Sequence, residues 1–323
     1  MIEKKPLVSV VIINFNSGEF IFDCIQHVID QAYINVEIIV IDNASTDGSS
    51  AKLSERIDID YFYSKENLGS SRANNLGISK SSGEYILVLN ADVFLSKSYV
   101  TQLLEFMESN KRVGTTIGLL VSDEDSAVID SAGIEIFYEG VCHEKGMGKP
   151  LAFAGNDIVQ VDGVCCAAAL YRKEMLDNIQ YQNEYFDKLM FAFVEDSDLS
   201  VRSTLLGWKS YMIPTARAAH LRGGSTGELS DFVIYLNLLN CEIMYRKIFS
   251  TYLTHRFFKM ALDFIRLFTV KQDLRFKLNK DIERMEQEIE LKRLHLVENK
   301  NYRRLNLRVS GGSYIFRRIF ENY

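Results

Sequence analysis

The eight residues Tyr85–Asp92, with the sequence YILVLNAD, begin as a buried strand and end in a carboxylate. The unbroken apolar run Ile86–Leu89 is typical of a strand that is covered on both faces, as in a parallel sheet. Asn90 and Asp92 follow at the carboxyl end of this strand, where open α/β sheets bind their ligands. A carboxylate there offers a hard oxygen ligand that can hold a divalent cation against nucleotide phosphates. An Asx turn that only closes the strand is the alternative.

Two further apolar runs end in polar side chains, which favours a ligand-binding edge over unrelated turns. Leu7–Ile13 is followed by Asn14 and Asn16, and Glu37–Ile41 is followed by Asp42. Strand-like and helical stretches alternate here, so we expect a parallel sheet with right-handed crossovers. The polar strand ends then share one edge of the sheet, and the sequence predicts a nucleotide-binding crevice at that edge. The other elements expected in this part are helices over Glu19–Gln31 and Ser70–Lys80 and a weaker strand over Asp60–Tyr63.

The turn after the first strand limits how a nucleotide would be held. It reads NFNSGE, so the Gly-rich turn of dinucleotide-binding proteins is absent, and no P-loop motif occurs in the chain. Without either phosphate cradle, a metal ion at Asp92 is the expected partner of the phosphates.

Five segments carry a resemblance to a known family. VVIINFNS, IIVIDNASTDGS, ENLGSSRANNLGI, GEYILVLNADV and FVEDSDLSVRSTLLGWK follow one another in this order. Over roughly residues 6 to 225 the chain resembles the family 2 glycosyltransferases, and among them the rhamnosyltransferase-like branch. The resemblance implies the GT-A fold, an α/β, Rossmann-like nucleotide-binding fold with a mixed, mainly parallel sheet flanked by helices. A C-terminal helical appendage would follow it.

The resemblance also implies roles for the polar residues of the first half. The nucleobase and ribose would meet Asn14, Asn16 and Asp42, and the helix after the third strand would approach the nucleotide or its diphosphate. Asn90-Ala91-Asp92 stands where many relatives have Asp-x-Asp, so a bound Mn²⁺ or Mg²⁺ would have one charged ligand fewer here. The complete set of donor-binding candidates is Asn14, Asn16, Asp42, Arg72, Asn75, Asn90 and Asp92.

Three carboxylates gather at Glu195, Asp196 and Asp198, just before a helical pattern. Acidic residues favour helix starts because they cap free N–H groups and suit the helix dipole, and this is the plainer explanation. An inverting sugar transfer also needs a general base for the acceptor hydroxyl. In the family's Glu-Asp pair the second residue is that base, which is Asp196 here. Glu195 and Asp198 would orient the loop, cap the helix or contact the acceptor.

Three single residues complete the candidate site. His220 ends the apolar strand Ala216–Ala219, and the resemblance implies that such a His, followed by a Gly/Ser loop, ligates the metal; a structural His is the alternative. Gly163 matches the family's acceptor-side segment, although packing explains it equally well. Trp208 is an acceptor-side candidate for which a place in the core is the alternative.

Composition and length agree with a cytoplasmic enzyme. The five cysteines are an odd number without a Cys-x-x-Cys pair, so neither a disulfide framework nor a zinc site is expected. The apolar start is too short for a signal peptide, and no run of 18 apolar residues suggests a membrane-spanning helix. We expect a catalytic domain over 1–240, with a donor-binding half at 1–120 and an acceptor-side half at 121–240. A helical region at 241–323 would follow.

Charge is divided unevenly between these two regions. Residues 241–323 contain 18 Lys and Arg against 10 Asp and Glu, whereas the whole chain has a net charge of −6. Since no nucleic-acid motif accompanies the bases, nucleic acid is not expected as a partner. Basic residues interleaved with aromatics, as in Tyr314–Phe320, suit an anionic membrane surface, and a packed helical subdomain with solvated bases is the alternative. Asp281–Val297 has near-heptad apolar spacing, which allows a helical homodimer contact.

The expected function is an inverting, metal-assisted sugar transfer. The donor would be dTDP-L-rhamnose or a UDP-hexose, and the acceptor a hydroxyl of a growing surface polysaccharide or lipid-linked glycan. A sugar nucleotidyltransferase is one rival, but it needs a Gly-rich, basic loop that NFNSGE does not provide. A non-catalytic nucleotide-sugar-binding or assembly subunit is the other rival, and the presence of both Asp92 and Asp196 argues against it.

Overall fold

The first part of the chain alternates between strands and helices, as the sequence predicts. The structure is a computed structural model that describes residues 5–123, 127–137, 142–222, 230–249, 256, 259–260, 263 and 270–298. The predicted strands and helices of this part are confirmed, with ends within two residues of those expected. The elements are β1 (Val8–Asn14), α1 (Phe20–Ile29), β2 (Val36–Asn43), α2 (Ser49–Ser54), β3 (Asp60–Ser64), α3 (Gly69–Lys80), β4 (Tyr85–Asn90), β5 (Val93–Leu95) and α4 (Tyr99–Ser109).

The middle of the chain is richer in short strands. Its elements are β6 (Val113–Val121), β7 (Ile129–Ser131), β8 (Ile134–Ile136), β9 (Cys142–Glu144), the 3₁₀ turn η1 (Leu151–Phe153), β10 (Val159–Val161), β11 (Ala168–Arg172), α5 (Lys173–Ile179), α6 (Glu195–Leu205) and β12 (Lys209–His220). β8 and β9 form a separate antiparallel hairpin. The helix predicted after the acidic cluster is α6, and the strand that ends at His220 is β12.

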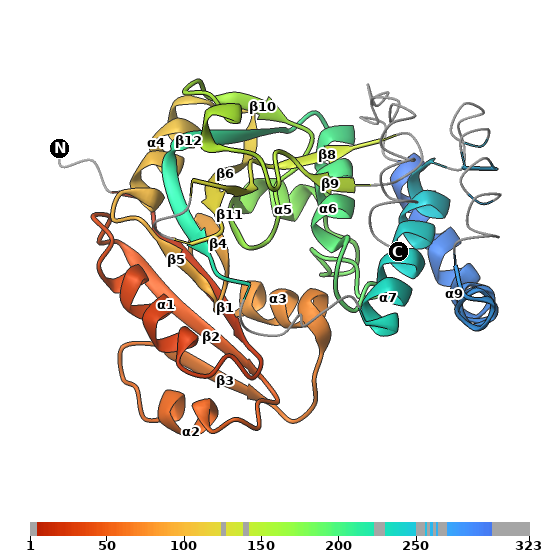
Figure 1. Ribbon diagram of the computed structural model, residues 1–323, viewed down its shortest axis with the longest axis horizontal. Helices are drawn as coiled ribbons and strands as arrows, with labels where there is room; N and C mark the ends of the chain where they lie inside the picture. Colours follow the sequence, from red (N-terminus) through yellow and green to blue (C-terminus); the bar gives the residue numbers. More distant parts are fainter. Residues whose placement is uncertain are drawn as a thin grey trace.

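These strands build a mixed sheet flanked by helices (Figure 1). Its order is β10-β12-β6-β11-β4-β1-β2-β3, with β5 paired to β12 and β7 paired to β6. The strands from β4 to β3 are mutually parallel, and β12 is parallel to β6. Strand β11 runs antiparallel to both of its neighbours, β4 and β6. The predicted fold class, a mainly parallel mixed sheet between helices, is confirmed.

Burial explains why the central strands are apolar without alternation. In β4 every residue except Asn90 is buried, and all of β6 is buried, because side chains on both faces meet packed elements. Helix α3 approaches the sheet closely at Gly77, where an added Cβ would lie only 2.2 Å from a methyl carbon of Val11. A glycine is required at that position so that α3 can pack on β1.

The reversed direction of β11 brings the segment before it to the ligand-binding edge. Ala168 pairs with Leu89 near the carboxyl end of β4, and the backbone N–H of Asn90 donates to Ala167 O at 2.9 Å. The segment 162–167 therefore lies beside Asn90. Residues of the acceptor-side half thus reach the same edge as the ends of the parallel strands.

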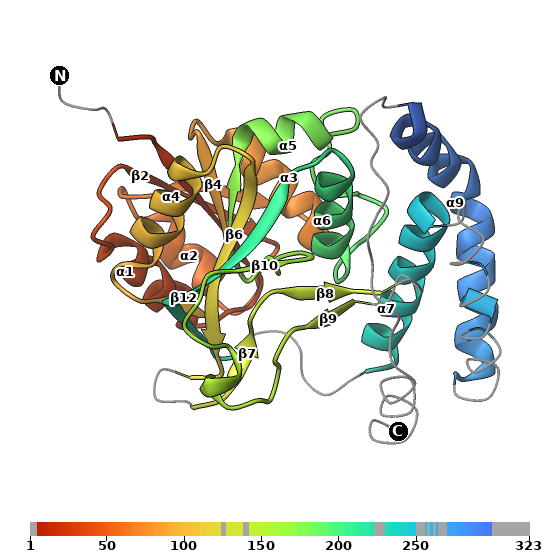
Figure 2. The same ribbon diagram turned by 90° about the horizontal axis from the view of Figure 1, so that it is seen from above.

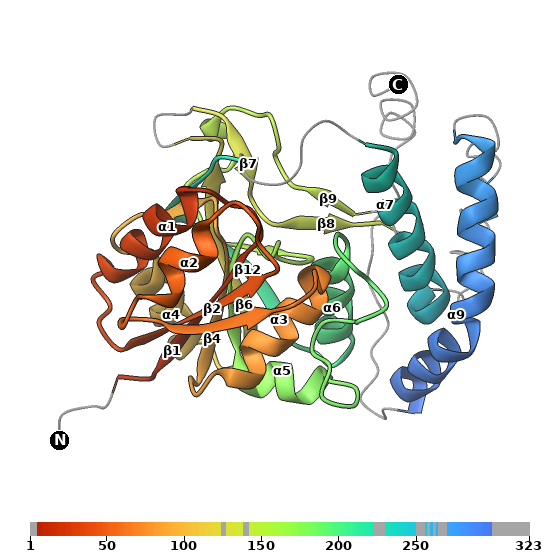
Figure 3. The same cartoon turned by 90° about the horizontal axis from the view of Figure 1, so that it is seen from below.

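Two C-terminal helices lie side by side next to α6, at the end of the molecule away from α1 and α2 (Figures 1 and 2). They are α7 (Asp231–Met244), which continues into the π-helical turn η2 (Tyr245–Phe249), and α9 (Gln272–Glu298). The β8–β9 hairpin extends toward α7 (Figures 2 and 3). The predicted domain boundary at residue 240 falls inside α7.

The near-heptad residues of α9 face the interior of this chain. Ile282 and Ile289 are buried, at 3% and 2% exposure, and Met285 and Leu296 pack against the same core. These side chains are therefore not available to a partner helix. The structure gives no support to the predicted homodimer contact through them, because packing within the chain already uses the apolar seam.

Some expectations concern residues outside the described ranges. The aromatic and basic stretch Tyr314–Phe320 lies there, as do the Gly/Ser loop residues 223–225 and the tail aromatics Tyr252, Phe257, Phe258, Phe264 and Phe268. Among the helices that the structure does describe, none combines the length and apolar character needed to cross a membrane.

Candidate active site

The ends of β1 and β2 are joined by a buried hydrogen bond between Asn14 and Asp42. Both side chains are fully buried. The Asn14 amide donates to Asp42 Oδ2 at 2.8 Å and to Ser49 Oγ at 2.8 Å. The second oxygen of Asp42 accepts from the Ser45 backbone N–H at 2.9 Å. This pair holds the loop after β2 against the end of β1. It forms a buried floor beneath the carboxyl edge of the sheet.

Asn16 lies above this floor and shapes the same loop. Its backbone is left-handed, with φ of 53°, which Asn tolerates better than most residues. Its side-chain oxygen accepts from the Thr46 backbone N–H at 2.7 Å. Asn16 is half-buried, so it remains accessible to a ligand at the edge.

Asp92 and His220 come together beyond the end of β4. His220 pairs with Val93 in the β12–β5 ladder, and its Nε2 atom lies 3.5 Å from Asp92 Oδ1. The other ring nitrogen, Nδ1, is 2.8 Å from Asp130 Oδ2. Asp130 belongs to β7 and is itself held by Arg222, whose Nε donates to Asp130 Oδ1 at 2.5 Å. The result is a row of alternating acidic and basic groups, most of which are well buried.

The charges in this row shift the pKa values of its members. Burial alone would lower the pKa of His220, but the hydrogen bonds to Asp130 and Asp92 raise it to about 9. Burial would raise the pKa of Asp130, but the hydrogen bonds from His220 and Arg222 hold it below its ordinary value. His220 and Asp130 are therefore both charged at neutral pH when no cation is bound.

The Asp92–His220 pair fits a divalent cation. Because Asp130 occupies Nδ1, His220 presents Nε2 toward Asp92, and such carboxylate–imidazole–metal arrangements orient many metal-binding histidines. Two ligands about 2.1 Å from one metal lie about 3 Å apart at right angles, close to the 3.5 Å found between Nε2 and Oδ1. No cluster of three or more His, Cys, Asp or Glu suited to a metal occurs among the residues that the structure describes.

Asp196 stands in the first turn of α6, facing the segment 162–167. Its Oδ2 accepts from the Cys166 backbone N–H at 3.4 Å, and its Oδ1 accepts from the Ser197 backbone N–H at 2.6 Å. The side chain is half-buried. Burial raises the pKa of Asp196 above its ordinary value, which makes the carboxylate more basic. Through Cys166 and Ala167, Asp196 is connected to Asn90 at the end of β4.

Glu195 and Asp198 each have other partners within the fold. The Ser70 hydroxyl of α3 donates to the buried Glu195 carboxylate. Burial and the neighbouring charge of Asp196 raise the pKa of Glu195 to about 7. Asp198 is fully buried and pairs with Arg202 at 2.8 Å and with Lys247 Nζ at 2.5 Å.

A further carboxylate, Glu144 of β9, interacts electrostatically with both Asp196 and Asp130. It accepts a hydrogen bond from the Ser131 hydroxyl, and Ser131 follows the Asp130 that holds His220. Burial and the charge of Asp196 raise the pKa of Glu144 to about 8. Glu144 is therefore mostly protonated at neutral pH and offers a hydrogen-bond donor on the acceptor side.

The remaining donor-binding candidates, two on α3 and one at the end of β4, differ in their exposure and contacts. Arg72 is exposed on α3. Asn75, on the same helix, uses its side chain to hold a loop: it donates to Phe186 O at 2.7 Å and accepts from the backbone N–H groups of Tyr185 and Phe186 at 3.0 and 2.9 Å. Asn90 is exposed at the end of β4.

Gly163 is needed for packing against α6. A Cβ at this position would lie 2.6 Å from both Cβ and Oγ of Ser200. The close approach lets the Ser200 hydroxyl accept from the Val164 backbone N–H at 3.3 Å. Gly163 thereby sets the distance between the Asp196 helix and the acceptor-side segment.

Trp208 does not reach the site. It is 8% exposed and precedes the amino end of β12, whereas His220 stands at the carboxyl end of the same strand. The 12 residues of β12 separate the two by roughly 35 Å at the usual strand rise. The structure places Trp208 in the core, which is the alternative named for it, and the acceptor-side role stays a prediction.

Several residues of this arrangement had no local signal in the sequence. Asp130 and Glu144 follow short, unremarkable apolar stretches, and their importance lies in contacts with partners far away in the chain. A search for carboxylates near the ends of short strands would have included Asp130, together with many surface residues. Lys247 and Lys292, which contact the loop before Asp196 or the helix after it, lie in the region treated as an appendage, and Asn240, which contacts the same loop, is the last residue before that region.

Comparison with known proteins places the chain in a family. The model of glycosyl transferase family 2 matches residues 9–180, more than half of the chain. The protein therefore belongs to glycosyl transferase family 2, which confirms the predicted resemblance. A relative from Bacillus subtilis (strain 168), named "Putative teichuronic acid biosynthesis glycosyltransferase TuaG", is 26% identical over 189 residues, covering 57% of this chain and 69% of that protein.

A second relative and a solved structure agree with this placement. "Glycosyltransferase GlyG" of Streptococcus pneumoniae serotype 4 is 29% identical over 126 residues, 38% of this chain and 42% of that protein. The crystal structure of GalNAc-T7 with UDP, GalNAc and Mn²⁺ superposes with a TM-score of 0.64 at 15% identity, over 90% of this chain and 58% of that one. The fold is thus the GT-A fold. The matches to GlyG and GalNAc-T7 span only about half of those proteins' lengths.

Proposed function

We propose that this protein is an inverting glycosyltransferase that moves a sugar from a nucleoside diphosphate to an acceptor hydroxyl. The observation that carries the proposal is the pairing of His220 with Asp92 at the strand edge, together with the basic Asp196 carboxylate on the neighbouring acceptor side. The Asp92–His220 pair suits the diphosphate leaving group, and Asp196 suits the attacking hydroxyl. An inverting transfer needs both, on opposite sides of the sugar.

The donor would lie over the ends of β1, β2 and β4. Because Asn14 and Asp42 are buried and bonded to each other, we assign them the role of holding the floor beneath the nucleobase and ribose. The more accessible Asn16 and Asn90 would then contact the donor directly. Arg72, which is exposed on α3, would meet the negative charge of the donor, and Asn75 would act through the loop that it holds.

A divalent cation, Mn²⁺ or Mg²⁺, would be held by Asp92 Oδ1 and His220 Nε2. When bound, it neutralises charge that develops on the departing diphosphate. Asp130 would keep the His220 ring oriented with Nε2 outward, and Arg222 would hold Asp130 in turn. With one carboxylate and one imidazole as protein ligands, the site would depend on the donor's own oxygens to complete the coordination.

Asp196 would act as the general base. Its carboxylate takes the proton of the acceptor hydroxyl while that oxygen attacks the anomeric carbon and the bond to the diphosphate breaks. The backbone N–H groups of Cys166 and Ser197 orient the carboxylate, and burial makes it more basic. Glu144, protonated at neutral pH, would donate a hydrogen bond to the acceptor from the opposite wall.

For the substrates we propose dTDP-L-rhamnose or a UDP-hexose as donor and a surface polysaccharide or lipid-linked glycan as acceptor. The motif resemblance to the rhamnosyltransferase-like branch supports the first donor. The UDP and Mn²⁺ in the GalNAc-T7 structure are the reason for including the second. The name of the TuaG relative, which refers to teichuronic acid biosynthesis, supports a polysaccharide acceptor.

The test measures nucleoside diphosphate released from dTDP-rhamnose, UDP-glucose and UDP-GalNAc, with Mn²⁺, Mg²⁺ or chelator. We expect release with one nucleotide class and loss of at least about 10²-fold in Asp196→Asn, because a general base contributes about 10²–10⁴-fold. Thermal shifts with dTDP and UDP should be the same in both proteins. Nucleotide binding without any release by the unmodified protein would favour a non-catalytic subunit. An Asp196→Asn variant that keeps more than a tenth of the activity would remove Asp196 from the role of base.

A further inference from the structure

The turn that precedes Asp196 has an unusual backbone. Phe193 and Val194 are both left-handed, with φ of 70° and 68°. A β-branched residue at positive φ is an outlier, and such a conformation persists only where surrounding contacts over-determine it. Val194 is also the N-cap residue of α6, and its carbonyl accepts the first helical hydrogen bond, from the Asp198 backbone N–H at 2.9 Å. The direction in which α6 presents Asp196 therefore depends on this turn.

Helix α7 holds the turn through one side chain. Asn240 is fully buried, and its amide donates to Ala192 O at 2.7 Å and to Phe193 O at 2.8 Å. Both of these carbonyls belong to the turn itself. Asn240 lies in the C-terminal helices rather than in the strand–helix scaffold.

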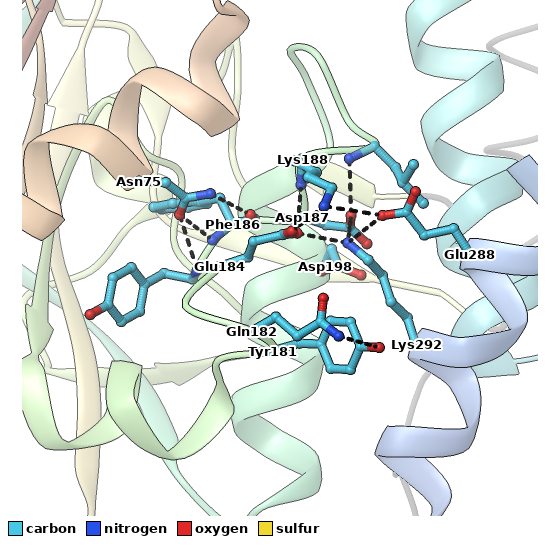
Figure 4. Close-up of polar contacts among 12 residues, drawn as sticks. Asn75, Tyr181, Gln182, Glu184, Phe186, Asp187, Lys188, Asp198, Glu288 and Lys292 are labelled. Atoms are coloured by element: carbon cyan, nitrogen blue, oxygen red, sulfur yellow. Dashed lines mark hydrogen bonds and ion pairs between the residues drawn. The ribbon is translucent and has the colours of Figure 1, made fainter.

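A second C-terminal side chain joins the segments on either side of the turn. Lys247, 3% exposed, places Nζ 2.5 Å from Asp187 Oδ2 and 2.5 Å from Asp198 Oδ1. Asp187 lies in the loop before the turn, and Asp198 lies in the first turn of α6 after it. Lys292 of α9 adds a third connection, with Nζ 2.5 Å from Asp187 Oδ1 and 2.8 Å from Glu184 Oε2 (Figure 4).

On its other side, the turn is contacted by helix α3 of the donor-binding half. The Ser70 hydroxyl of α3 donates to Glu195, and Gly69 approaches so closely that an added Cβ would lie 2.1 Å from Phe191 O. The turn is therefore held between α3, which belongs to the nucleotide-binding half, and α7. Removing the α7 contacts would leave the left-handed residues supported from one side only.

From this arrangement we infer that Asn240 and Lys247 are positioning residues for the transfer reaction. They hold the Phe193–Val194 turn in the conformation that aims Asp196 at the acceptor hydroxyl, and neither belongs to the donor-binding edge. The C-terminal helices are thus part of the catalytic unit. The inference rests on the proposed function, in which Asp196 is the general base.

The experiment compares two asparagines of α7. Asn240→Leu keeps the approximate size of the side chain and removes both donated hydrogen bonds. Asn237→Leu is the matched control, because Asn237 lies nearly one turn earlier and donates only within its own helix, to Val233 O at 2.9 Å. For Asn240→Leu we expect kcat to fall about 10–100-fold, since a 1 Å misplacement of a catalytic group costs up to about 10²-fold. The donor KM and the thermal shift with nucleoside diphosphate should stay unchanged in both variants.

A second substitution separates positioning from general stability. Glycine adopts positive φ without the Cβ penalty, so Val194→Gly lowers the cost of the left-handed turn. In the Asn240→Leu background, Val194→Gly should restore part of the lost kcat. Unchanged kcat in Asn240→Leu overturns the inference. A loss of kcat that parallels the fall in melting temperature, and that Val194→Gly does not restore, also overturns the inference.

Asp196→Asn, measured alongside, distinguishes the two possible failures. If Asp196→Asn is inactive and Asn240→Leu is normal, the positioning role fails while the proposed function stands. If Asp196→Asn keeps its activity, Asp196 is not the general base and the positioning role fails with that assignment, whereas the proposed transfer itself fails only if the unmodified protein releases no nucleoside diphosphate.

Discussion

His220 Nε2 faces Asp92 Oδ1 across 3.5 Å, and this contact joins the end of β12 to the end of β4. His220 ends β12, whereas Asp92 lies in the turn between β4 and β5. Strands β4 and β12 are not neighbours in the main sheet, and the pairing of the short β5 strand with β12 brings the two residues together. Because Asp130 occupies the other ring nitrogen, His220 presents Nε2 toward Asp92, which is the orientation that the proposed metal site requires. The predictions for metal binding follow from that orientation.

The metal-binding role of Asp92 predicts a binding loss that depends on the cation. Asp92→Ala should weaken nucleoside diphosphate binding in Mn²⁺ far more than in chelator, because the carboxylate acts on the phosphates through the metal. Isothermal titration in both conditions measures the difference. Equal losses with and without Mn²⁺ would make Asp92 a turn residue or a direct hydrogen-bond acceptor.

The carboxylate behind His220 should tune the affinity of the metal. Asp130→Asn leaves the two proposed ligands in place but weakens the contact that orients the ring, and losses of such partners cost about 10–100-fold in metal affinity. Asp157→Asn is the control, because Asp157 is exposed outside the site. Mn²⁺ titration in the presence of nucleotide is the measurement. If Asp130→Asn and the control bind Mn²⁺ with equal affinity, Asp130 does not orient the His220 ring for the metal.

The raised pKa of Glu195 predicts how stability depends on pH. Burial and the charge of Asp196 raise this pKa from 4.5 to about 7, so between these pH values the folded protein binds more protons than the unfolded chain. The contribution of Glu195 to the free energy of unfolding is therefore fully present below pH 4.5 and is lost as pH rises through about 7.

Glu195→Gln should remove this dependence. Relative to the unmodified protein, the variant should gain stability as pH rises from 4.5 to 7, by an amount on the order of a few kcal/mol. Urea denaturation across this range is the measurement, with the exposed Glu174→Gln as control. Parallel curves for Glu195→Gln and the unmodified protein would mean that Glu195 titrates normally in the folded state.

The buried cation Lys247 should contribute far more to stability than an exposed one. Lys247→Met leaves Asp187 and Asp198 short of one partner each, and breaking a buried ion pair from one side costs about 3–5 kcal/mol. Lys271→Met breaks the exposed pair with Asp231, for which about 0–1 kcal/mol is expected. Chemical denaturation of both variants gives the comparison. Similar small losses would mean that Lys292 and Arg202 satisfy the two carboxylates without Lys247.

The basic tail predicts reversible binding to anionic vesicles. Residues 299–323 contain six Lys and Arg and one acidic residue, and each base near an anionic surface contributes about 1 kcal/mol, which salt screens. Replacing Arg303, Arg304, Arg317 and Arg318 by Gln should abolish co-sedimentation with anionic vesicles while leaving nucleotide affinity intact. These substitutions are preferable to a truncation near residue 246, because that truncation would remove Lys247 and Lys292 from their buried carboxylates. Protein that stays in the supernatant at low salt would end the membrane hypothesis.

The donor-binding edge could be predicted from the sequence because its signals are local. An unbroken apolar run identifies a doubly covered strand, and the residue after the run marks its end. Once alternating helices imply parallel strands, the ends of those strands must share one edge. Asn14, Asp42 and Asp92 were placed together on these grounds. The Asp196 helix could be predicted for a similar reason, since acidic residues stand at its start.

The order of elements and the edge where polar residues collect can therefore be read from the sequence. Which distant side chains meet at that edge depends on how the chain folds. Asp130 reaches His220, and Asn240 reaches the Phe193 carbonyl, through strand order and helix packing that leave no periodic trace in the sequence. Composition likewise could not separate the buried Lys247 from the exposed Lys271. The physical reason is that periodicity reports which face of an element is buried, whereas the partner on that face depends on how whole elements pack.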